Sequence, residues 1–432
     1  MIIKNIVANR KRNLWLLLEM VIITIVTWII IDPVVVLLTI EGMSQGYEKE
    51  RLVNITVSGI NESSPKYSTE SSDSSGMAKA FDVLINRILN TEGVESATPS
   101  GMSLDGGSSS LYGILIEESG DTTLLFYNVM MMPIKRDYFT THGIQSAGDS
   151  PSVEYLSNLE MGEKDVIITE DLALKLFGNS GKYIGKEMKS VGSTHEGNHV
   201  VGVVKTVRPW QSKANSYVAW HCIKYDATRI AKYHDEIIVR LKEGYSPSQW
   251  VRAHKEEMLR EYKAGNIYIS RVITYTQKSA GSPHAIKSDS EKRLKYALLV
   301  FFLLNLGLGV AGLYYFQTRR RSHDAGLMKS YGATKGTIFG MLVGEALTIT
   351  FTGWIAGCLI YLHFALEKGL SAGLESSISD FPSYCWVSNF WSHYAIVSAV
   401  VLAVLSIIVF IGVCLPAYRI AQINPVDALR QE

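Results

Sequence analysis

The sequence predicts a membrane protein in which four transmembrane helices carry a large α+β domain outside the cytoplasm. Three observations predict this fold class. Four long stretches are nearly free of charge, charged residues make up only 19% of the 432 residues, and the stretch at 41–291 has the composition of a soluble protein. Because a helix needs about 20 apolar residues to cross a hydrocarbon core of ~30 Å, each long apolar stretch is a candidate span.

The four spans follow a short cytoplasmic segment at residues 1–13. They are predicted at 14–40, 292–318, 338–362 and 394–415, and the second includes a charged, stalk-like extension before its apolar run at 296–316. The first span lacks the short apolar region and small-residue exit of a cleavable signal peptide. We therefore expect it to remain as an anchor.

The distribution of Lys and Arg predicts the orientation. These residues gather in 1–13, in the loop at 319–337 and in the C-terminal segment at 416–432, whereas the loop at 363–393 has one Lys and no Arg. Short loops rich in Lys and Arg stay in the cytoplasm. Both termini should therefore be cytoplasmic, and residues 41–291 should lie outside.

Two strand–helix–strand patterns lie near the two ends of the external domain. The first covers 52–58, 77–89 and 94–98, and the second covers 236–241, 247–262 and 268–275. They predict one discontinuous β-α-β subdomain at about 45–129 and 234–290. The insert at about 130–233 should have strands at 165–169, 187–191 and 199–207, and a helix at 170–177 that ends at Gly178.

Composition and motifs exclude several classes of protein. With 42 Lys and Arg against 41 Asp and Glu, the sequence has no electrostatic basis for binding nucleic acid. No G-x-x-x-x-G-K-[ST] motif occurs, so these residues contain no P-loop for ATP hydrolysis. Cys222 and Cys385 both lie in predicted external segments, and whether they pair is left open.

A zinc-protease pattern occurs at His195-Glu196-Gly197-Asn198-His199. In such enzymes a helix places both imidazoles on one face. Here turn-forming residues lie between two strand-like segments, which favours a hairpin turn. A membrane-anchored zinc peptidase or a ligand-sensing receptor is thus the alternative from a different class, and no catalytic or metal-binding residue is predicted.

Two carboxylates lie inside predicted spans, Glu19 and Glu345. A charged side chain costs about 2.5 to 3.5 kcal/mol at the centre of a membrane, so each should face a partner, a cavity or the interface. For Glu345, capture by a basic residue or backbone donor is favoured over a proton-transport role. Glycines spaced four apart predict close helix packing in the third span: Gly340, Gly344, Gly353 and Gly357.

The loop at 319–337 predicts a short amphipathic helix at the membrane surface. Asp324 is suited to cap it, Leu327, Met328 and Tyr331 form one apolar stripe, and Gly332 ends it. Such a helix either lies on lipid or enters a groove of a partner.

This loop resembles the MacB/FtsX-like permeases of ABC transporters. Their loop reads R-x-x-E-I-G-L-x-x-x-x-G-A-x-x-x-x-I before a span with an early Glu, and the matching residues are Arg321, Gly326, Leu327, Gly332, Ala333, Ile338 and Glu345. Asp324 and Ala325 depart from the family's Glu and Ile. Residues 416–430 are similar to the family's P-A-x-x-A-x-x-x-x-P-x-x-A-L-R ending at nearly every fixed position, and 166–178, 184–186 and 200–204 are similar to the core domain that MacB-type permeases carry outside the membrane.

The resemblance implies a function in the cytoplasmic membrane of a bacterium. A non-catalytic permease would couple ATP hydrolysis by a separate cytoplasmic ATPase, which binds the ATP and Mg²⁺, to movement of its external domain. This mechanotransmission would serve efflux or export of a peptide, lipoprotein or antimicrobial compound. The large external domain favours the MacB or LolC/LolE branch over FtsX, so a lipoprotein-releasing subunit and an FtsX-like regulator of cell-wall hydrolases are alternatives.

The resemblance also implies partners and site residues. A second permease chain, identical or different, is expected, with membrane lipid and a periplasmic adaptor or outer-membrane protein as further partners. The residues implied in coupling to the ATPase are Asp324, Gly326, Leu327, Met328, Tyr331, Gly332 and Ala333.

Overall fold

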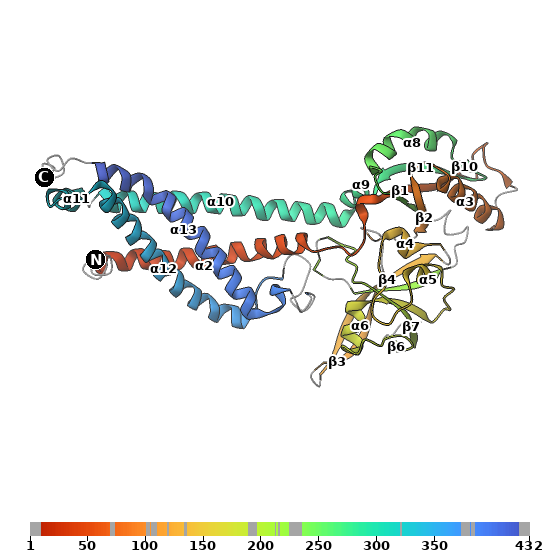
Figure 1. Cartoon of the computed structure of the whole chain (residues 1–432), viewed down its shortest axis with the longest axis horizontal. Coiled ribbons are helices and arrows are strands. Elements are labelled where there is room, and N and C mark those ends of the chain that lie inside the picture. Colours follow the sequence, from red (N-terminus) through yellow and green to blue (C-terminus); the bar gives the residue numbers. More distant parts are fainter. Residues whose placement is uncertain are drawn as a thin grey trace. The chain divides into compact units, whose positions relative to one another are not determined.

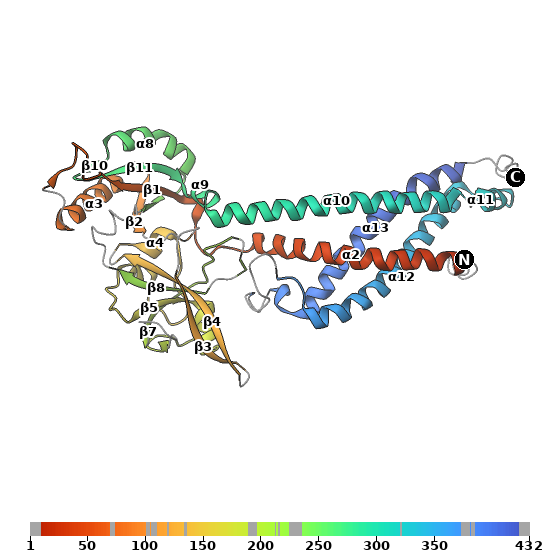
Figure 2. The same cartoon turned by 180° about the vertical axis from the view of Figure 1, so that it is seen from behind.

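The structure is a computed structural model, and Figures 1 and 2 show it from opposite sides. It describes residues 10–69, 74–100, 104, 110–118, 121–133, 136–188, 197–211, 213–214, 217–223, 236–319, 322–372, 381 and 385–422. The chain divides into two compact units. The membrane unit consists of residues 1–41 and 289–432, and the sheet unit consists of residues 42–288.

Four long helices dominate the membrane unit, and all four are long and apolar enough to cross a membrane. They are α2 (Arg10–Gly42), α10 (Pro283–Arg319), α12 (Lys335–Lys368) and α13 (Phe390–Gln422). Two short helices accompany them, α11 (Ser322–Ser330) and the 3-10 helix η4 (Trp386–Ser388). The predicted four-helix membrane architecture is confirmed.

Glycines bring the helices of the membrane unit close together. A Cβ atom added at Gly353 would lie 2.6 Å from the Cβ of Met20, and one at Gly357 would lie 2.7 Å from the Cβ of Thr24. At Gly412 of α13 it would lie 3.3 Å from the backbone nitrogen of Ala311 in α10. Helix α2 therefore packs on α12, and α13 on α10, at distances that larger side chains do not allow.

The basic residues that precede the second apolar run lie in the first part of α10, where one of them has a partner in α2. Lys292 forms an ion pair with Glu41 at the end of α2, with 2.8 Å between Nζ and Oε1. Its side chain is largely buried. The basic residue thus joins two helices of the membrane unit.

A five-stranded sheet forms the first half of the sheet unit. Its strands are β1 (Leu52–Gly59), β2 (Val94–Ser100), β9 (Glu236–Leu241), β10 (Lys263–Ala264) and β11 (Ile267–Thr274). They follow the order β10-β11-β1-β9-β2, and all neighbours are antiparallel. The helices α3 (Ser74–Leu89) and α8 (Pro247–Glu261) connect β1 to β2 and β9 to β10. Each strand–helix–strand unit therefore leaves room for one strand of the other unit, as in split β-α-β folds.

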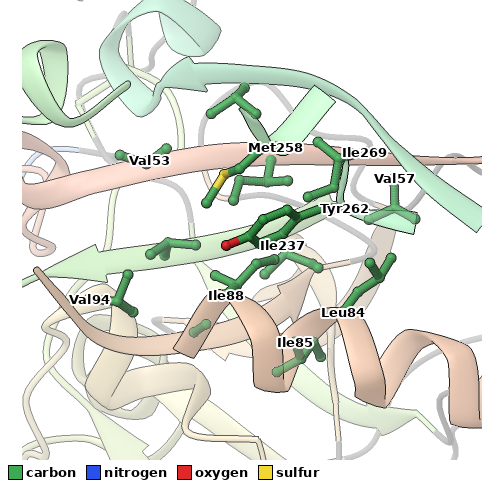
Figure 3. Packing of buried hydrophobic residues seen from close by; sticks show 14 of the residues in the cluster. Val53, Val57, Leu84, Ile85, Ile88, Val94, Ile237, Met258, Tyr262 and Ile269 are labelled. Atoms are coloured by element: carbon green, nitrogen blue, oxygen red, sulfur yellow. The ribbon is translucent and has the colours of Figure 1, made fainter. Parts of the chain in front are cut away.

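Alternation along the strands builds the core of this five-stranded subdomain (Figure 3). Val53 and Ile55 of β1 face α3 and α8, whereas Leu52 faces the opposite side of the sheet. From α3 the core receives Phe81, Leu84, Ile85 and Ile88, the stripe that the spacing predicts. Both faces of β1 are therefore buried.

A six-stranded sheet forms the other half of the sheet unit. Its strands are β3 (Ser110–Glu118), β4 (Asp121–Pro133), β5 (Asp165–Thr169), β6 (Glu187–Met188), β7 (Asn198–Val204) and β8 (Val218–Ile223), in the order β3-β4-β8-β5-β7-β6. The pairs β4/β8 and β5/β7 are parallel and the others antiparallel. Its short helices are α4 (Tyr138–His142), α5 (Val153–Asn158) and α6 (Glu170–Phe177).

The six-stranded subdomain begins earlier than the sequence predicts. Because β4 pairs in parallel with β8, from Asn128 opposite Val218 to Pro133 opposite Ile223, the hairpin β3–β4 belongs to this sheet. The predicted boundary at residue 130 is therefore wrong, and the inserted part begins by Ser110. The helix α6 ends as predicted at Gly178, whose φ of 69° lies in the left-handed region.

Candidate functional site

A helix–turn–helix formed by α11 and α12 carries most of the residues that the sequence singles out. The amide of Gly332 donates to the carbonyl of Lys329 at 2.9 Å, and the amide of Ala333 donates to that of Met328 at 3.0 Å. With φ of 90° at Gly332, this is a Schellman turn. Thr334 then caps α12, since its hydroxyl accepts from the amide of Thr337 at 3.2 Å.

Asp324 does not cap α11. The helix begins at Ser322, so Asp324 is its third residue and lies in the first turn. The side chain of Asp324 lies outside what the structure describes.

The two faces of α11 differ. Ala325 is buried in a cluster with residues of α2, α10, α12 and α13, and Gly326 is buried beside it. On the other face, Leu327 has 47% of its surface exposed and Tyr331 has 85%. The helix is therefore held on the membrane unit by one face while large apolar groups remain uncovered on the other.

These uncovered groups line a groove between α11 and the start of α12. We name it the α11–α12 groove; its volume is about 650 Å³, and its lining is Leu327, Met328, Tyr331, Gly332, Ala333, Thr337, Ile338, Gly340 and Met341. Five of the seven predicted coupling residues lie in this lining. Gly326 is buried and is not part of this lining.

The predicted intramembrane residues lie in different surroundings. Glu345 is buried with 3% of its surface exposed, and Glu19 is half-buried. The four glycines divide into two pairs. Gly353 and Gly357 contact α2, whereas a Cβ at Gly340 would meet nothing within 4 Å and Gly344 is half-buried.

A buried ion pair that sequence reasoning missed connects α2 to α13. Asp32 Oδ1 lies 2.6 Å from His393 Nε2, and both side chains are almost wholly buried. Asp32 Oδ2 accepts from the amide of Ser371, at 3.0 Å, in the segment after α12. The ring of Trp386 stands edge-on to the imidazole, 5.1 Å between centroids. The only sign of this pair in the sequence is that an acidic residue, Asp32, lies in the first apolar stretch.

Neither a zinc site nor a disulfide is found among the residues that the structure describes. No three His, Cys, Asp or Glu side chains cluster as metal ligands there. Asn198 and His199 lie on strand β7, where Glu187 pairs with His199, so the helix that a zinc protease needs is not formed. His195 and Glu196 lie outside the described residues. None of the four cysteines, Cys222 and Cys385 included, forms a disulfide bond.

Comparison with known families decides what kind of protein carries this groove. Residues 296–425 match the model of the FtsX-like permease C-terminal family, which includes α11, α12 and α13. Together with the relatives named MacB, this match supports a MacB/FtsX-like ABC permease. The conclusion agrees with the four apolar helices and with the resemblance of the 319–337 loop.

Curated relatives extend the likeness of the chain beyond the matched region. It is 24% identical over 311 residues to the macrolide export ATP-binding/permease protein MacB of Chromobacterium violaceum, covering 71% of this chain and 44% of that protein. A MacB of Yersinia pestis is 23% identical over 319 residues, with 72% and 46% covered. The uncharacterized ABC transporter permease YknZ of Bacillus subtilis is 31% identical over 130 residues, 30% of this chain and 29% of that one. The chain spans less than half the length of these relatives.

Solved structures with a similar outline include two external domains. The periplasmic region of MacB from Actinobacillus actinomycetemcomitans is 11% identical with a TM-score of 0.29, covering 56% of this chain and 95% of that one. The extracellular domain of YknZ from Gram-positive bacteria is 13% identical with a TM-score of 0.24, covering 50% and 100%.

Proposed function

We propose that this MacB/FtsX-like permease couples ATP hydrolysis by a cytoplasmic ATPase to movement of its sheet unit on the other side of the membrane. The α11–α12 groove carries this proposal. Its apolar lining is open, it lies on a helix whose other face is fixed to the membrane unit, and it contains the residues that the loop motif predicts. An apolar groove fixed in this way suits the docking of a protein partner.

The proposal assigns each part of the chain a role. The ATPase, with its ATP and Mg²⁺, occupies the groove on the cytoplasmic side, and α2 and α10 connect this side to the sheet unit. We place residues 42–288 outside the cytoplasm and both termini inside, in the inner membrane of a bacterium. A second permease chain completes the transporter. Export of a peptide, lipoprotein or antimicrobial compound is the proposed activity, since the relatives named MacB are macrolide export proteins.

The docking step is tested by Leu327→Asp. A carboxylate in the groove lining places an unpaired charge where the partner would bury it, so co-purification of the ATPase with the full-length chain should fall at least ~10-fold. The matched control is Leu174→Asp in α6, because Leu174 has 41% of its surface exposed and lies in the sheet unit. Unchanged co-purification with Leu327→Asp would show that the groove does not bind the ATPase.

The orientation is tested by labelling with a membrane-impermeant maleimide in intact cells, after replacement of the four native cysteines. Ser180→Cys, at an exposed position after α6, should be labelled. Ser330→Cys, at the exposed end of α11, should be labelled only after the cells are opened. The reverse pattern would place the sheet unit in the cytoplasm and would refute the proposed function.

A further inference from the structure

The chain that leaves α2 is held by a buried arginine of the six-stranded subdomain. Arg208 Nη1 donates to the carbonyls of Met43 at 2.7 Å and Ser44 at 3.3 Å. Its Nε donates to the carbonyl of Lys213 at 2.9 Å, and its Nη2 to that of Gln211 at 3.1 Å. Only 3% of Arg208 is exposed. One guanidinium thus joins the first residues after α2 to the loop between β7 and β8.

The backbones on the two sides of this contact also meet directly. The amide of Arg208 donates to the carbonyl of Gln45 at 2.9 Å, and Gln45 Nε2 donates back to the carbonyl of Arg208 at 3.4 Å. At Gly46, φ is 79°, and a Cβ would collide with the carbonyl oxygen of Thr206. We call the contact of residues 43–46 with residues 206–213 the Arg208 clamp.

The chemistry of the clamp depends on arginine. A guanidinium has five N–H donors in a fixed plane, so it reaches carbonyls on both segments at once. A lysine has three donors on one nitrogen, and an apolar side chain has none. Since hydrogen bonds from a charged donor are about twice as strong as neutral ones, removal of the guanidinium should open the clamp.

The clamp joins residues 43–46 to the loop between β7 and β8 of the six-stranded sheet, whereas the chain that enters α10 leaves the five-stranded sheet at β11. Val207, within the clamp, is fully buried in the cluster that contains Val204 of β7 and Val218 of β8. At the other end of the sheet unit, β11 leads into α9 (Tyr275–Ala280), which starts with a capping box between Thr274 and Gln277. Lys278 of α9 forms an ion pair with Glu236 of β9. The chain then continues into α10.

We propose that Arg208 is the positioning residue that makes movement of α2 act on the six-stranded subdomain, while movement of α10 acts on the five-stranded one. Without the clamp, residues 43–46 would lose their hold on the loop between β7 and β8, and the chain after α2 would be tied first at Glu48, to His142 and to Arg240 of β9. With it, a displacement of α2 reaches the loop between β7 and β8 before it reaches the five-stranded sheet. The inference rests on the proposed coupling to an ATPase. It adds which helix moves which subdomain.

The first measurement tests the clamp itself by hydrogen exchange of the full-length chain in nanodiscs. Arg208→Met should increase exchange at least ~10-fold in peptides that cover residues 43–51 and 205–214, because opening the clamp separates the amide of Arg208 from the carbonyl of Gln45 and lets water reach the backbone of both segments. Peptides that cover β9 and β11 should be unchanged. Equal exchange in the first two peptides would overturn the proposal.

Two further variants keep the test valid if Arg208→Met folds poorly. Gly46→Ala attacks the clamp from the opposite side and should give the same pattern, whereas Arg208→Lys should give a smaller increase. The matched control is Gly181→Ala, since Gly181 also has a positive φ, 64°, but a Cβ there would meet nothing within 4 Å. If Gly181→Ala raised exchange at 43–51 as much as Gly46→Ala does, backbone strain would explain the effect and the clamp would be refuted.

The second measurement tests the division of movement. Spin labels at Ser180 of the six-stranded subdomain and Glu257 of the five-stranded one, both exposed, report the distance between them with the ATPase bound. Addition of ATP should change this distance in the parent chain and in Gly181→Ala, and the change should be lost in Arg208→Met and Gly46→Ala. A full change in the clamp variants, or none in the parent with ATPase bound, would overturn the inference. Failure of the ATPase to bind the parent chain would instead refute the proposed function.

Discussion

The two units each contain a completely buried histidine, and the two histidines are held in opposite ways. His393 of the membrane unit has the carboxylate of Asp32 at 2.6 Å from its Nε2. His142 of the sheet unit has its Nδ1 2.8 Å from the carbonyl oxygen of Tyr138, and the nearby charges that act on it are the cations Lys278 and Arg240. One imidazole is bonded to a carboxyl group, and the other has two cations nearby, each of which is paired with a carboxylate.

The difference predicts the perturbation to which each unit is most sensitive. A buried polar group that loses its hydrogen-bond partner is costly, so the membrane unit depends on keeping the Asp32–His393 pair complete. A buried histidine near cations is stable only while neutral, so the sheet unit depends on the pH. Mutation of a partner should therefore affect the first unit most, and acid should affect the second.

The largest expected effect comes from Asp32→Ala. It leaves His393 and the amide of Ser371 buried without their carboxylate, at a cost of about 3 to 5 kcal/mol. Thermal unfolding of the full-length chain in detergent should occur at clearly lower temperature. The double variant Asp32→Ala with His393→Phe should recover part of the loss. A cost below about 1 kcal/mol would show that the pair does not hold α2 to α13.

The second effect is the acid sensitivity of His142. Burial lowers the pKa of His142 from 6.5 to about 4. The hydrogen bond to Tyr138 opposes this shift, and the charges of Lys278 and Arg240 add to it. Because the folded-state pKa is below the unfolded one, the contribution of neutral His142 is complete above pH 6.5 and is lost as the pH falls toward 4. At pH 5 the loss should be about 2 kcal/mol.

This loss is measured by unfolding the full-length chain between pH 7 and pH 4 and comparing it with His142→Gln. Glutamine keeps a donor for the carbonyl of Tyr138 and does not titrate, so its stability should fall less steeply in this window. Parallel pH profiles of the two chains would contradict the assignment of the acid sensitivity to His142.

The smallest effect concerns packing that holds α2 in addition to the ion pair. Gly357→Ala places a methyl group 2.7 Å from the Cβ of Thr24 and 3.1 Å from the carbonyl oxygen of Val21, which should cost roughly 1 kcal/mol. Gly340→Ala is the matched control in the same helix, because its methyl group would meet nothing within 4 Å. Equal unfolding temperatures for the two variants would mean that the α2–α12 contact is looser than the structure shows.

Local patterns in the sequence were sufficient for the membrane helices and for the apolar stripe and the turn at the end of α11. The spacing of Leu327, Met328 and Tyr331 and the position of Gly332 determine the exposed stripe and the turn within one short segment. Membrane spans and helix ends depend on neighbouring residues, and for this reason a single sequence reveals them.

The hairpin β3–β4 was not predicted from the sequence because β3 lacks a clear alternation of apolar and polar residues. Leu111 and Leu115 of β3 are exposed although apolar, whereas Ile114 between them is buried. With apolar side chains on both faces, the period of two that identifies a half-buried strand is lost. The boundary of the inserted subdomain was consequently placed too late.

Long-range partners were beyond the reach of the sequence. The Asp32–His393 pair joins residues 361 positions apart, and the bond from Arg208 to Met43 joins residues 165 apart. Nothing near either residue indicates its partner. The same limit applies to the prediction of close helix packing at the glycines. Gly340 and Gly357 belong to identical motifs, and only the fold determines that Gly357 contacts another helix and Gly340 does not.

The position of the inserted subdomain has a consequence for how such proteins diversify. Ser100 at the end of β2 lies directly opposite Glu236 at the start of β9, so residues 101–235 leave and re-enter the scaffold at one point. Doubling the length of a closed loop costs only about 0.6 kcal/mol of loop-closure entropy. The inserted segment can therefore be lengthened, shortened or exchanged without a change in the strand order of the five-stranded sheet. Related chains are thus free to carry a different inserted subdomain at this junction on the same five-stranded sheet.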